Sequence, residues 1–484
     1  MTSYLDPEKI LQYHPTARKI IERLRSKNWQ TVIVGGAVRD LLREKLDPQF
    51  ELELSTKDID IATAAPVDRI KSILKDLKTL EIGEKFGVIM VIDPGKENRT
   101  YEIAQFRKEK NYDGRKPGEV EHAPSLREDL NRRDFTVNGM ALNIDGELID
   151  PFNGEKDLQE RKIRAIRNPE QRFLEDHLRM IRAIRFACHL DGKIEGSTFM
   201  AIKEHAEKIE NISWERISEE LFKILDTERS AKGIELMDES NLLKYILPEL
   251  TENKGVDQKE EYHPEGDVFD HSLKALSVAD KLSYRPLLKL ATLLHDIGKG
   301  RALKRNRGNH MGGHEEIGSR ISESIGERLR LPRAKINRLS WIVLNHMRCA
   351  KLPLMKKAKK VQIIRHNSRK DSNLDDINEK FGAFADLIRI LIADSQASAH
   401  QSEGWLPAIK EFTSLLPHLR DLDRRKDARE LLNGNDLLKM GMEEGPMIGE
   451  ILEKIHHKFY AGEIVNRNEA LEEARKLVKE AGVD

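Results

Sequence analysis

Two aspartates placed two positions apart are the side chains of this chain best suited to catalysis. Asp58 and Asp60 lie in the segment KDIDIA at residues 57–62, whose alternation of apolar and polar residues predicts a β-strand. Because side chains two positions apart on a strand point to the same face, the two carboxylates would lie side by side. They repel each other unless a cation joins them, and Mg²⁺ suits that role because it takes oxygen ligands and keeps positions open for phosphates. An isolated Asp-x-Asp is also common among surface residues that bind nothing, so the neighbouring segments matter.

Two glycines upstream fit a site for phosphates. Gly35 and Gly36 follow the apolar segment QTVIV at residues 30–34, which predicts a buried strand, and they precede a predicted helix at Ala37–Arg43. At such a junction bare backbone N–H groups can approach a triphosphate, although a tight turn would use glycines as well. Downstream, Glu102 lies on another predicted strand and is a candidate third carboxylate, with a face that the sequence does not determine.

A further basic segment suits the recognition of a nucleotide. The chain reads Arg132-Arg133-Asp134, and a guanidinium pairs with phosphate in a bidentate fork. We therefore expect these arginines to contact a triphosphate or a ribose.

A carboxylate and a guanidinium further along could choose between bases. Asp176 and Arg179 are three positions apart on a predicted helix and so occupy neighbouring positions of one face. Cytosine and adenine each offer an amino donor beside a ring-nitrogen acceptor, whereas uracil and guanine place a carbonyl beside an N–H donor. Asp176 could accept from the amino group while Arg179 donates to the ring nitrogen, with Glu175 orienting Arg179. The alternative is an ordinary surface ion pair. Arg182 and Arg185 extend the basic stripe and contact RNA or face solvent.

Histidines and aspartates recur through the second half of the chain. In order they are His271, the dipeptide His295-Asp296, His314, His346 and Asp394. Neutral imidazoles and carboxylates suit divalent transition metals, and an open coordination position could activate water for phosphate-ester hydrolysis. His314 and His346 would allow a second metal. Any one of these residues alone could be a core or surface residue, and His263 and His310 fall outside the pattern.

A small α/β unit followed by helices must position these residues. Apolar patterning predicts a helix at Ala17–Asn28 and strands at residues 30–34, 57–62, 86–92 (Phe86–Ile92) and 101–106 (Tyr101–Phe106). Beyond Arg161 the strand pattern disappears, and helical patterns continue to the end of the chain. The densest charge runs, Lys299–Arg307 and Lys356–Lys360, are either solvated surface or phosphate contacts.

Composition narrows the class of protein. At about 150 residues per domain, 484 residues predict about three domains. The content of 39% apolar and 34% charged residues excludes a disordered or collagen-like chain, and 83 basic against 83 acidic residues argue against a uniformly basic nucleic-acid-binding protein but permit local basic grooves. The apolar stretches are too short to span a membrane, and the first residues lack the apolar core of a signal peptide. Two cysteines, Cys188 and Cys349, fit a reducing compartment, so we expect a cytoplasmic protein.

Five motifs, in their order and spacing, resemble the class II tRNA nucleotidyltransferases, a family of CCA-adding enzymes, A-adding enzymes and bacterial poly(A) polymerases. The motifs are GGAVRD at Gly35–Asp40, KDIDIAT at Lys57–Thr63, RRDFTVNGMAL at Arg132–Leu142, DPFNGEKDL at Asp150–Leu158 and EDHLRMIRAIRFA at Glu175–Ala187. The resemblance implies an α/β head with a mixed sheet, of the polymerase-β-like nucleotidyltransferase fold, followed by an all-α neck, body, HD domain and helical tail. It also implies metal-dependent transfer of CMP and AMP from CTP and ATP to the 3′ hydroxyl of a tRNA, with release of pyrophosphate.

The resemblance also implies roles for individual residues. Asp58, Asp60 and Glu102 are the expected catalytic carboxylates, with Mg²⁺ on Asp58 and Asp60 in a two-metal site. The expected nucleotide contacts are Gly35, Gly36, Arg39, Arg132, Asp134, Asn138, Asp176, Arg179 and Arg182. Asp176 and Arg179 match the base readers of the family's EDxxR motif. The chain departs from the family at Gly139, where alanine is usual, and this glycine loosens the backbone next to Asn138, the expected ribose contact.

A change of specificity from C to A requires movement, because the two bases differ in size and the 3′ end grows. Arg107–Arg132 is a long polar stretch containing Gly114, Pro117 and Gly118, and we expect a flexible loop over the site. In the family, enzymes that add only CC tend to have this loop shortened. Its full length here argues against a CC-only enzyme.

The second constellation resembles the HD phosphohydrolase superfamily. The strings LLHDIGKG at Leu293–Gly300 and HEEIG at His314–Gly318 carry this resemblance. It implies that His271, His295, Asp296, His314, His346 and Asp394 hold a divalent transition metal such as Mn²⁺, Ni²⁺ or Co²⁺. HD domains on some bacterial nucleotidyltransferases act as phosphatases or 2′,3′-cyclic phosphodiesterases, so a second activity is possible here.

The sequence predicts four domains and leaves three functions open. The expected domains are a nucleotidyltransferase head at 1–155, a helical neck and body at 156–255, an HD domain at 262–400 and a helical tail at 401–484. CCA addition to tRNA is the first function, and addition of A alone or of poly(A) is the second. The third, an HD phosphohydrolase with an inactive head, is the weakest, since the Asp58/Asp60 pair and the base readers are intact. The oligomeric state is not indicated.

Overall fold

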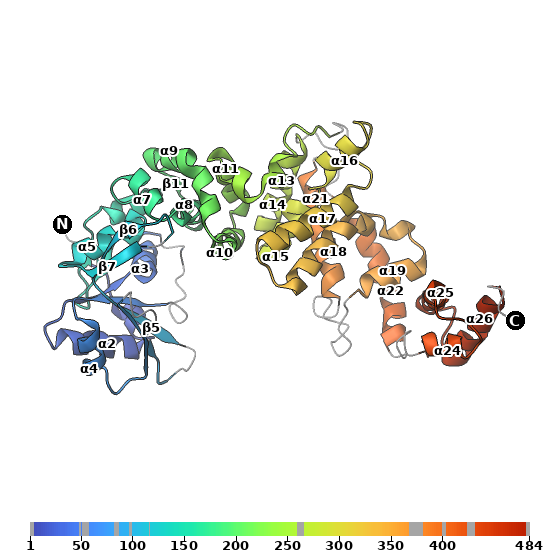
Figure 1. The fold of residues 1–484 in the computed structure, drawn as a ribbon, viewed down its shortest axis with the longest axis horizontal. Helices are drawn as coiled ribbons and strands as arrows, with labels where there is room; N and C mark the ends of the chain where they lie inside the picture. Colours follow the sequence, from blue (N-terminus) through green and yellow to red (C-terminus); the bar gives the residue numbers. More distant parts are fainter. Residues whose placement is uncertain are drawn as a thin grey trace. The chain divides into compact units, whose positions relative to one another are not determined.

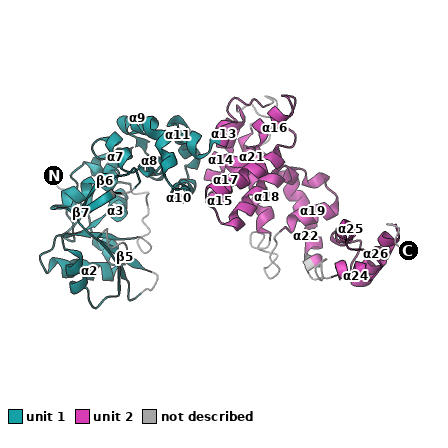
Figure 2. Ribbon diagram, viewed as in Figure 1, with its two compact units in different colours: residues 1–248 teal, residues 249–484 magenta. Residues whose placement is uncertain are grey.

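The structure is a computed structural model. It describes residues 4–47, 50, 58–81, 87–95, 99–115, 117–258, 266–366, 381–398, 403–423 and 431–480. The chain divides into two compact units, Met1–Pro248 and Glu249–Asp484, which Figure 2 shows in different colours. The division into head, neck and body, HD domain and tail remains a prediction.

Unit 1 begins with a seven-stranded sheet in the order β3-β4-β5-β2-β1-β8-β9. Figure 1 labels strand β5 of this sheet. Its strands are β1 (Thr31–Val34), β2 (Asp60–Thr63), β3 (Thr79–Glu81), β4 (Val88–Ile92), β5 (Thr100–Gln105), β8 (Ala141–Leu142) and β9 (Leu148–Ile149). Strand β2 pairs parallel with β5 and antiparallel with β1, so the sheet is mixed and the predicted α/β head is confirmed. Lys57 and Phe86, the first residues of two predicted strands, lie outside the described residues.

Burial explains why the sheet positions its carboxylates at one edge. All four residues of β1 are buried, whereas β2 begins with an exposed Asp60 followed by three buried residues. Val32 and Val34 of β1 pack in one apolar cluster with Phe106 and Leu130. The polar start of β2 is therefore held at the rim of a packed core.

Short helices flank and follow the sheet. They are α1 (Glu8–Leu11), α2 (Pro15–Arg25), α3 (Gly36–Leu46), α4 (Val67–Ile73), α5 (Leu126–Asn131), the 3₁₀ helix η2 (Thr136–Asn138) and α6 (Gly154–Gln159). Helix α3 starts directly after β1, as the sequence predicts.

The prediction of a flexible loop at Arg107–Arg132 is wrong for most of these residues. Residues 107–122 form an antiparallel hairpin of β6 (Arg107–Tyr112) and β7 (Pro117–His122), and α5 follows. Five of the six residues of β6 are charged or polar, and Tyr112 is its one aromatic residue, so hydrophobic periodicity does not reveal the strand.

The remainder of unit 1 is mostly helical. It contains α7 (Pro169–Glu175), α8 (Leu178–His189), α9 (Gly196–His205), the 3₁₀ helix η3 (Ala206–Asn211), α10 (Trp214–Leu225), α11 (Ser230–Glu239) and α12 (Leu243–Ile246). Two short strands, β10 (Lys162–Ile163) and β11 (Lys193–Ile194), pair in parallel, so the expectation of no strand beyond Arg161 is wrong for these four residues. Such two-residue strands are too short for an alternating pattern.

The described residues of unit 2 form helices and no strand. After α13 (Pro248–Thr251) at the boundary, they are α14 (Val268–Lys281), α15 (Pro286–Leu294), α16 (Lys299–Arg305), α17 (His314–Arg328), α18 (Arg333–Ala350), the 3₁₀ helix η4 (Leu352–Leu354), α19 (Lys357–Ile364), α21 (Gly382–Ala397), α22 (Leu406–Asp423), α24 (Gly434–Leu438), α25 (Pro446–Ala461) and α26 (Arg467–Glu480). Helix α18 packs against α17, α15 and α21. None of the helices in the described part of the chain is both long and apolar enough to cross a membrane.

Candidate active site and metal centre

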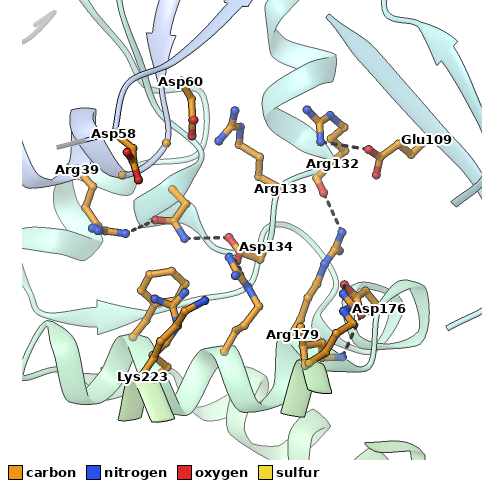
Figure 3. A pocket seen from close by; sticks show the side chains of 18 residues that line it. Arg39, Asp58, Asp60, Glu109, Arg132, Arg133, Asp134, Asp176, Arg179 and Lys223 are labelled. Carbon is orange, nitrogen blue, oxygen red and sulfur yellow. Dashed lines mark hydrogen bonds and ion pairs between the residues drawn. The ribbon is translucent and has the colours of Figure 1, made fainter. Parts of the chain in front are cut away.

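A polar cavity of about 630 Å³ in unit 1 gathers most of the predicted site residues (Figure 3). Its described lining consists of Gly35, Gly36, Arg39, Asp58, Asp60, Glu109, Arg132, Arg133, Asp134, Asn138, Asp176, Leu178, Arg179, Arg182, Arg185, Phe186, Arg216 and Lys223. All nine predicted nucleotide contacts are among them, together with two of the three predicted carboxylates.

The carboxylates meet at the start of β2. Asp60 pairs in register with Val34 of β1 on one side and with Glu102 of β5 on the other, and Asp58 lies two residues before it. Although Asp60 is exposed in part, the surrounding protein desolvates its carboxyl group, and this desolvation is the main cause of its raised pKa. The charges of Glu102 and Asp58 raise the pKa further, and Arg133 opposes the shift. Three acidic groups therefore act on one another here, as a cation site requires. Glu102 is beside Asp60 but is not part of the described cavity wall.

Gly35 brings the backbone close to this acidic group. Its φ is +75°, and a Cβ at this position would lie 3.2 Å from Asp60 Oδ2 and 3.3 Å from Arg133 Nη1. Both the left-handed backbone and the narrow space favour glycine. The next residue, Gly36, opens α3, so the N-terminus of an 11-residue helix borders the cavity.

A chain of hydrogen bonds fixes the floor of the cavity. Arg39 Nη1 donates to Asn138 Oδ1 (2.8 Å), Asn138 Nδ2 donates to Asp134 Oδ1 (2.9 Å), and Arg182 Nε donates to Asp134 Oδ2 (2.9 Å). Burial alone would raise the pKa of Asp134, but the charge of Arg182 and the hydrogen bond from Asn138 hold it well below its usual range. Asp134 is therefore ionised and locks two elements of the site together.

The two arginines of the predicted triphosphate contact differ in their surroundings. Arg132 donates to Asp129 Oδ1 (3.0 Å) and to Glu109 Oε1 (3.1 Å), so carboxylates already occupy part of its guanidinium. Arg133 Nε is buried and has no hydrogen-bond partner among the described residues. Arg133 is thus better placed than Arg132 to bind an added anion.

Asp176 and Arg179, the predicted base-reading pair, lie on either side of a break between two helices. Asp176 ends α7 with an extended backbone and Arg179 lies in α8, so the single helix expected to carry both is wrong. Asp176 Oδ1 accepts from the backbone N–H of Leu178, the first residue of α8 (3.1 Å), so the carboxylate holds the turn between the two helices. No glycine or proline marks this break in the sequence.

Arg179 is buried and held by three acceptors. Its Nη1 donates to Glu175 Oε2 (2.9 Å) and to the carbonyl of Arg172 (3.3 Å), and its Nη2 donates to the carbonyl of Arg132 (3.0 Å). The expected contact of Glu175 with Arg179 is present, and the alternative of a surface ion pair between Asp176 and Arg179 is not what the structure shows. Among the described residues, no acceptor engages Nε of Arg179.

Sequence reasoning missed the contribution of α10 and of the hairpin. Arg216 Nη2 donates to Asp176 Oδ2 (3.1 Å), and buried Glu220 lies 2.6 Å from Arg185 Nε and 3.4 Å from Lys223 Nζ. Arg216, Glu220 and Lys223 are spaced four and three apart, so they share one helix face; this spacing was the available signal. No pattern in the sequence indicated that Glu109 of β6 would line the cavity.

In unit 2 the six predicted metal ligands come together. His271 Nε2 lies 2.9 Å from Asp394 Oδ1, His295 Nε2 lies 3.2 Å from Asp296 Oδ2, and His314 Nε2 lies 3.3 Å from both Asp296 Oδ1 and His346 Nε2. Two ligand groups result, His271/His295/Asp296 and Asp296/His314/His346, with Asp296 in both. His310 is in neither group, as expected, and His263 lies outside the described residues.

The outer hydrogen bonds of these histidines suit metal binding. Nδ1 of His295, His314 and His346 lies 2.7 to 3.0 Å from a backbone carbonyl of Thr292, Met311 and Val343, respectively. An Nδ1–H that donates to a carbonyl leaves the Nε2 lone pair free for a cation. Burial alone would lower the pKa of His295, but Asp296 and Asp394 raise it to about 10, which shows how strongly this centre favours positive charge. The donor set therefore fits a divalent cation.

Known families match the chain along most of its length. The Poly A polymerase head domain matches residues 31–164, a "Probable RNA and SrmB- binding site of polymerase A" matches 193–254, and the HD domain matches 268–378. The family described as "tRNA nucleotidyltransferase domain 2 putative" matches residues 411–474. The head and HD domains both imply dependence on a divalent metal.

Individual relatives extend the match to the whole chain. The CCA-adding enzyme of Ligilactobacillus salivarius is 32% identical over 477 residues, which cover 98% of this chain and 99% of that enzyme. A crystal structure of the Bacillus stearothermophilus CCA-adding enzyme in complex with CTP superimposes with a TM-score of 0.63 at 25% identity, over 97% of this chain and 99% of that one. The fold is also that of the Thermotoga maritima CCA-adding enzyme complexed with tRNA (TM-score 0.58, 22% identity, 98% and 96% covered). Together with the cavity of unit 1 and the histidine centre of unit 2, these matches establish that the chain, which also carries an HD domain, belongs to the CCA-adding enzymes, a family of tRNA nucleotidyltransferases.

Proposed function

We propose that unit 1 builds the C-C-A end of tRNA by transferring CMP and AMP from CTP and ATP to the 3′ hydroxyl. One observation carries this proposal. The acidic group of Asp58 and Asp60 and the base-reading pair of Asp176 and Arg179 line the same cavity, so the reacting phosphate and the base of one nucleotide can be held at once.

Asp58 and Asp60 would hold Mg²⁺, with Glu102 beside them. Bound there, two such ions supply activation of the attacking hydroxyl and neutralisation of charge on the leaving pyrophosphate. The remaining work falls to the chain itself. Backbone N–H groups at Gly35 and Gly36 approach the phosphates, and the guanidinium of Arg133, which lies close to Gly35 and lines the same cavity, can pair with them.

Side chains would replace a nucleic-acid template in choosing the base. Asp176 accepts from the amino group of cytosine or adenine, and Arg179 donates to the ring nitrogen beside it. Arg179 keeps donors for this purpose, because Glu175 and two backbone carbonyls engage only Nη1 and one N–H of Nη2.

The decisive experiment offers purified protein with three tRNA transcripts and each nucleoside triphosphate separately. The transcripts end at the discriminator base, at C and at CC. We expect CMP on the first two and AMP on the third. Incorporation of A alone, and only onto CC, would replace this proposal with an A-adding enzyme, and untemplated runs of A would indicate a poly(A) polymerase. The absence of any incorporation would show that the head is inactive.

A second activity is favoured by the histidine centre of unit 2. We infer that it hydrolyses phosphate esters, because Asp296 joins two ligand groups whose Nε2 atoms converge. The test is hydrolysis of 2′,3′-cyclic nucleotides and of a generic phosphomonoester by protein loaded with Mn²⁺, Ni²⁺ or Co²⁺. Activity that EDTA removes and the metal restores supports the inference, and inactivity of the loaded protein contradicts it.

A further inference from the structure

Unit 2 also contains a basic cavity that is separate from the histidine centre. It has a volume of about 750 Å³ and lies among α18, η4, α19 and α25. Its described lining is Trp341, Asn345, Arg348, Leu354, Met355, Lys356, Lys359, Gln362, Ile363, His366, Glu453 and His457. The volume is within the range of small-ligand sites and could hold one or two nucleotides.

An aromatic stack forms one wall of this cavity. The rings of Trp341 and His366 lie 4.2 Å apart with only 3° between their planes. Burial lowers the pKa of His366, and the charge of Arg338 lowers it further, so the imidazole is neutral near pH 7. A parallel pair of neutral rings in a cavity wall is a platform onto which another flat ring can stack.

Cations without acidic partners surround the stack. Lys356 and Lys359 are exposed, and neither forms an ion pair with a described residue. Arg348 donates to the side-chain oxygen of Asn345 (3.2 Å) and has no carboxylate partner in the described part of unit 2. Glu453, the one acid of the described lining, lies 3.8 Å from Nε2 of His457. The cavity therefore carries uncompensated positive charge next to an aromatic surface.

We propose that this cavity binds an unpaired nucleotide of an RNA chain, with its base against the Trp341–His366 stack and its phosphates against Lys356, Lys359 and Arg348. Stacking on aromatic side chains is how proteins hold unpaired bases, and free cations beside the stack match the phosphates of the same strand. The assignment of that RNA to the tRNA substrate rests on the function proposed above. The geometry itself requires only a base with neighbouring phosphates.

An RNA nucleotide would contact both the aromatic stack and the cations of the cavity, whereas other classes of ligand would contact only one of these features. A peptide segment of Asp and Glu alone would use the lysines but has no flat ring for the stack, and an apolar partner would use Leu354, which is 87% exposed, but not the cations. An RNA nucleotide uses both.

The test measures RNA binding by the full-length protein, with a tRNA transcript and an unstructured ten-nucleotide RNA as probes. Trp341→Ala should weaken both affinities about tenfold, whereas Trp341→Phe, which keeps a ring, should change them less than threefold. Lys356→Ala and Lys359→Ala should each reduce the slope of log affinity against log salt by about 0.7 to 0.9. The matched control is Lys351→Ala, which removes an exposed lysine outside the cavity lining and should leave the slope unchanged.

The lysine variants keep the proposal open to refutation even if Trp341→Ala unfolds, because both lysines are exposed. Equal RNA affinity and equal salt slopes in all variants would overturn it. So would equal losses for heparin and RNA with no effect of Trp341→Ala, which would indicate a plain polyanion surface, or mononucleotides that bind as tightly as RNA. Failure of the function proposed for unit 1 is a separate result, since it would remove nucleotide incorporation by the wild type while leaving this RNA binding in place.

Discussion

Arg216 Nη2 lies 3.1 Å from Oδ2 of Asp176, so the carboxylate proposed to read the base is already held by a guanidinium from α10. The other η nitrogen of Arg216 donates to the carbonyl of Arg115 in the turn of the β6–β7 hairpin (3.1 Å). The hairpin also pairs directly with this segment, because the backbone N–H of His177 donates to the carbonyl of Gly114 (2.9 Å). Hydrogen bonds thus connect Asp176, the proposed base reader, to both the hairpin and α10.

Removal of the carboxylate from this structure should relax the choice of base. In Asp176→Ala the amino group of cytosine or adenine loses its acceptor, while Arg179 can donate to a carbonyl of uracil or guanine instead. We expect the preference for CTP over UTP to fall at least tenfold, with incorporation still measurable. The measurement is kcat/KM for each nucleotide on tRNA ending at the discriminator base. Glu219→Ala, which removes an exposed acid from α10, is the control, and an unchanged preference in Asp176→Ala would exclude side-chain templating.

Two adjacent glycines offer a matched test of the close approach at the acidic group. In Gly35→Ala the new Cβ would lie 3.2 Å from Asp60 Oδ2 at a φ of +75°, so the turn or the carboxylate must move. In Gly36→Ala the nearest atom is Arg39 Nη2 at 3.7 Å, an ordinary contact. We predict a loss of incorporation of about 10 to 100-fold for Gly35→Ala and a clearly smaller loss for Gly36→Ala. Equal losses would mean that the space beside Asp60 is not critical.

The raised pKa of Asp60 predicts competition between protons and Mg²⁺. A raised pKa means that Asp60 takes up its proton at a higher pH than an ordinary aspartate, and the protonated acid is a poor metal ligand. Incorporation should therefore fall as the pH falls through that pKa, and higher Mg²⁺ should move the midpoint to lower pH. The measurement is the rate against pH at two Mg²⁺ concentrations. A midpoint independent of Mg²⁺ would disagree with Asp60 as a ligand.

The histidine centre should lose metal in steps. Asp296 belongs to both ligand groups and His346 to one, so Asp296→Ala should empty the centre and His346→Ala should leave one metal. Elemental analysis of metal-loaded, desalted protein measures this directly. His310→Ala is the control, because His310 lines the same cavity as Asp296, His314 and Asp394 but belongs to neither ligand group. Full metal content in Asp296→Ala would refute the assignment of ligands.

Local patterns predicted the elements that a short apolar segment determines. The buried strand β1 and the helix that starts after its glycines follow from the pattern of apolar residues, and the same holds for the helices that carry His271 and His346. The six predicted metal ligands could be named because their motif and order are informative even though they lie far apart in sequence, and the structure brings them together.

Tertiary contacts decided what local patterns could not. The β6–β7 hairpin consists mostly of polar residues, with Tyr112 and Val120 as exceptions, and is held by strand pairing, so its sequence resembles a loop. Arg216 and Glu109 are ordinary charged residues until α10 and the hairpin bring them to the cavity. At Asp176 the backbone becomes extended and the carboxylate accepts from the N–H of Leu178, a local hydrogen bond that competes with continuation of α7.

The acidic group at the start of β2 is the centre of the proposed chemistry, and Asp60→Ala tests it most directly. The measurement is CMP incorporation into tRNA under single-turnover conditions, together with tRNA affinity of the same protein. We predict that incorporation is abolished while tRNA affinity stays within about twofold of the wild type, and that Asp68→Ala, which removes an exposed aspartate of α4, changes neither. Retained turnover in Asp60→Ala would contradict the assignment of this group as the metal site.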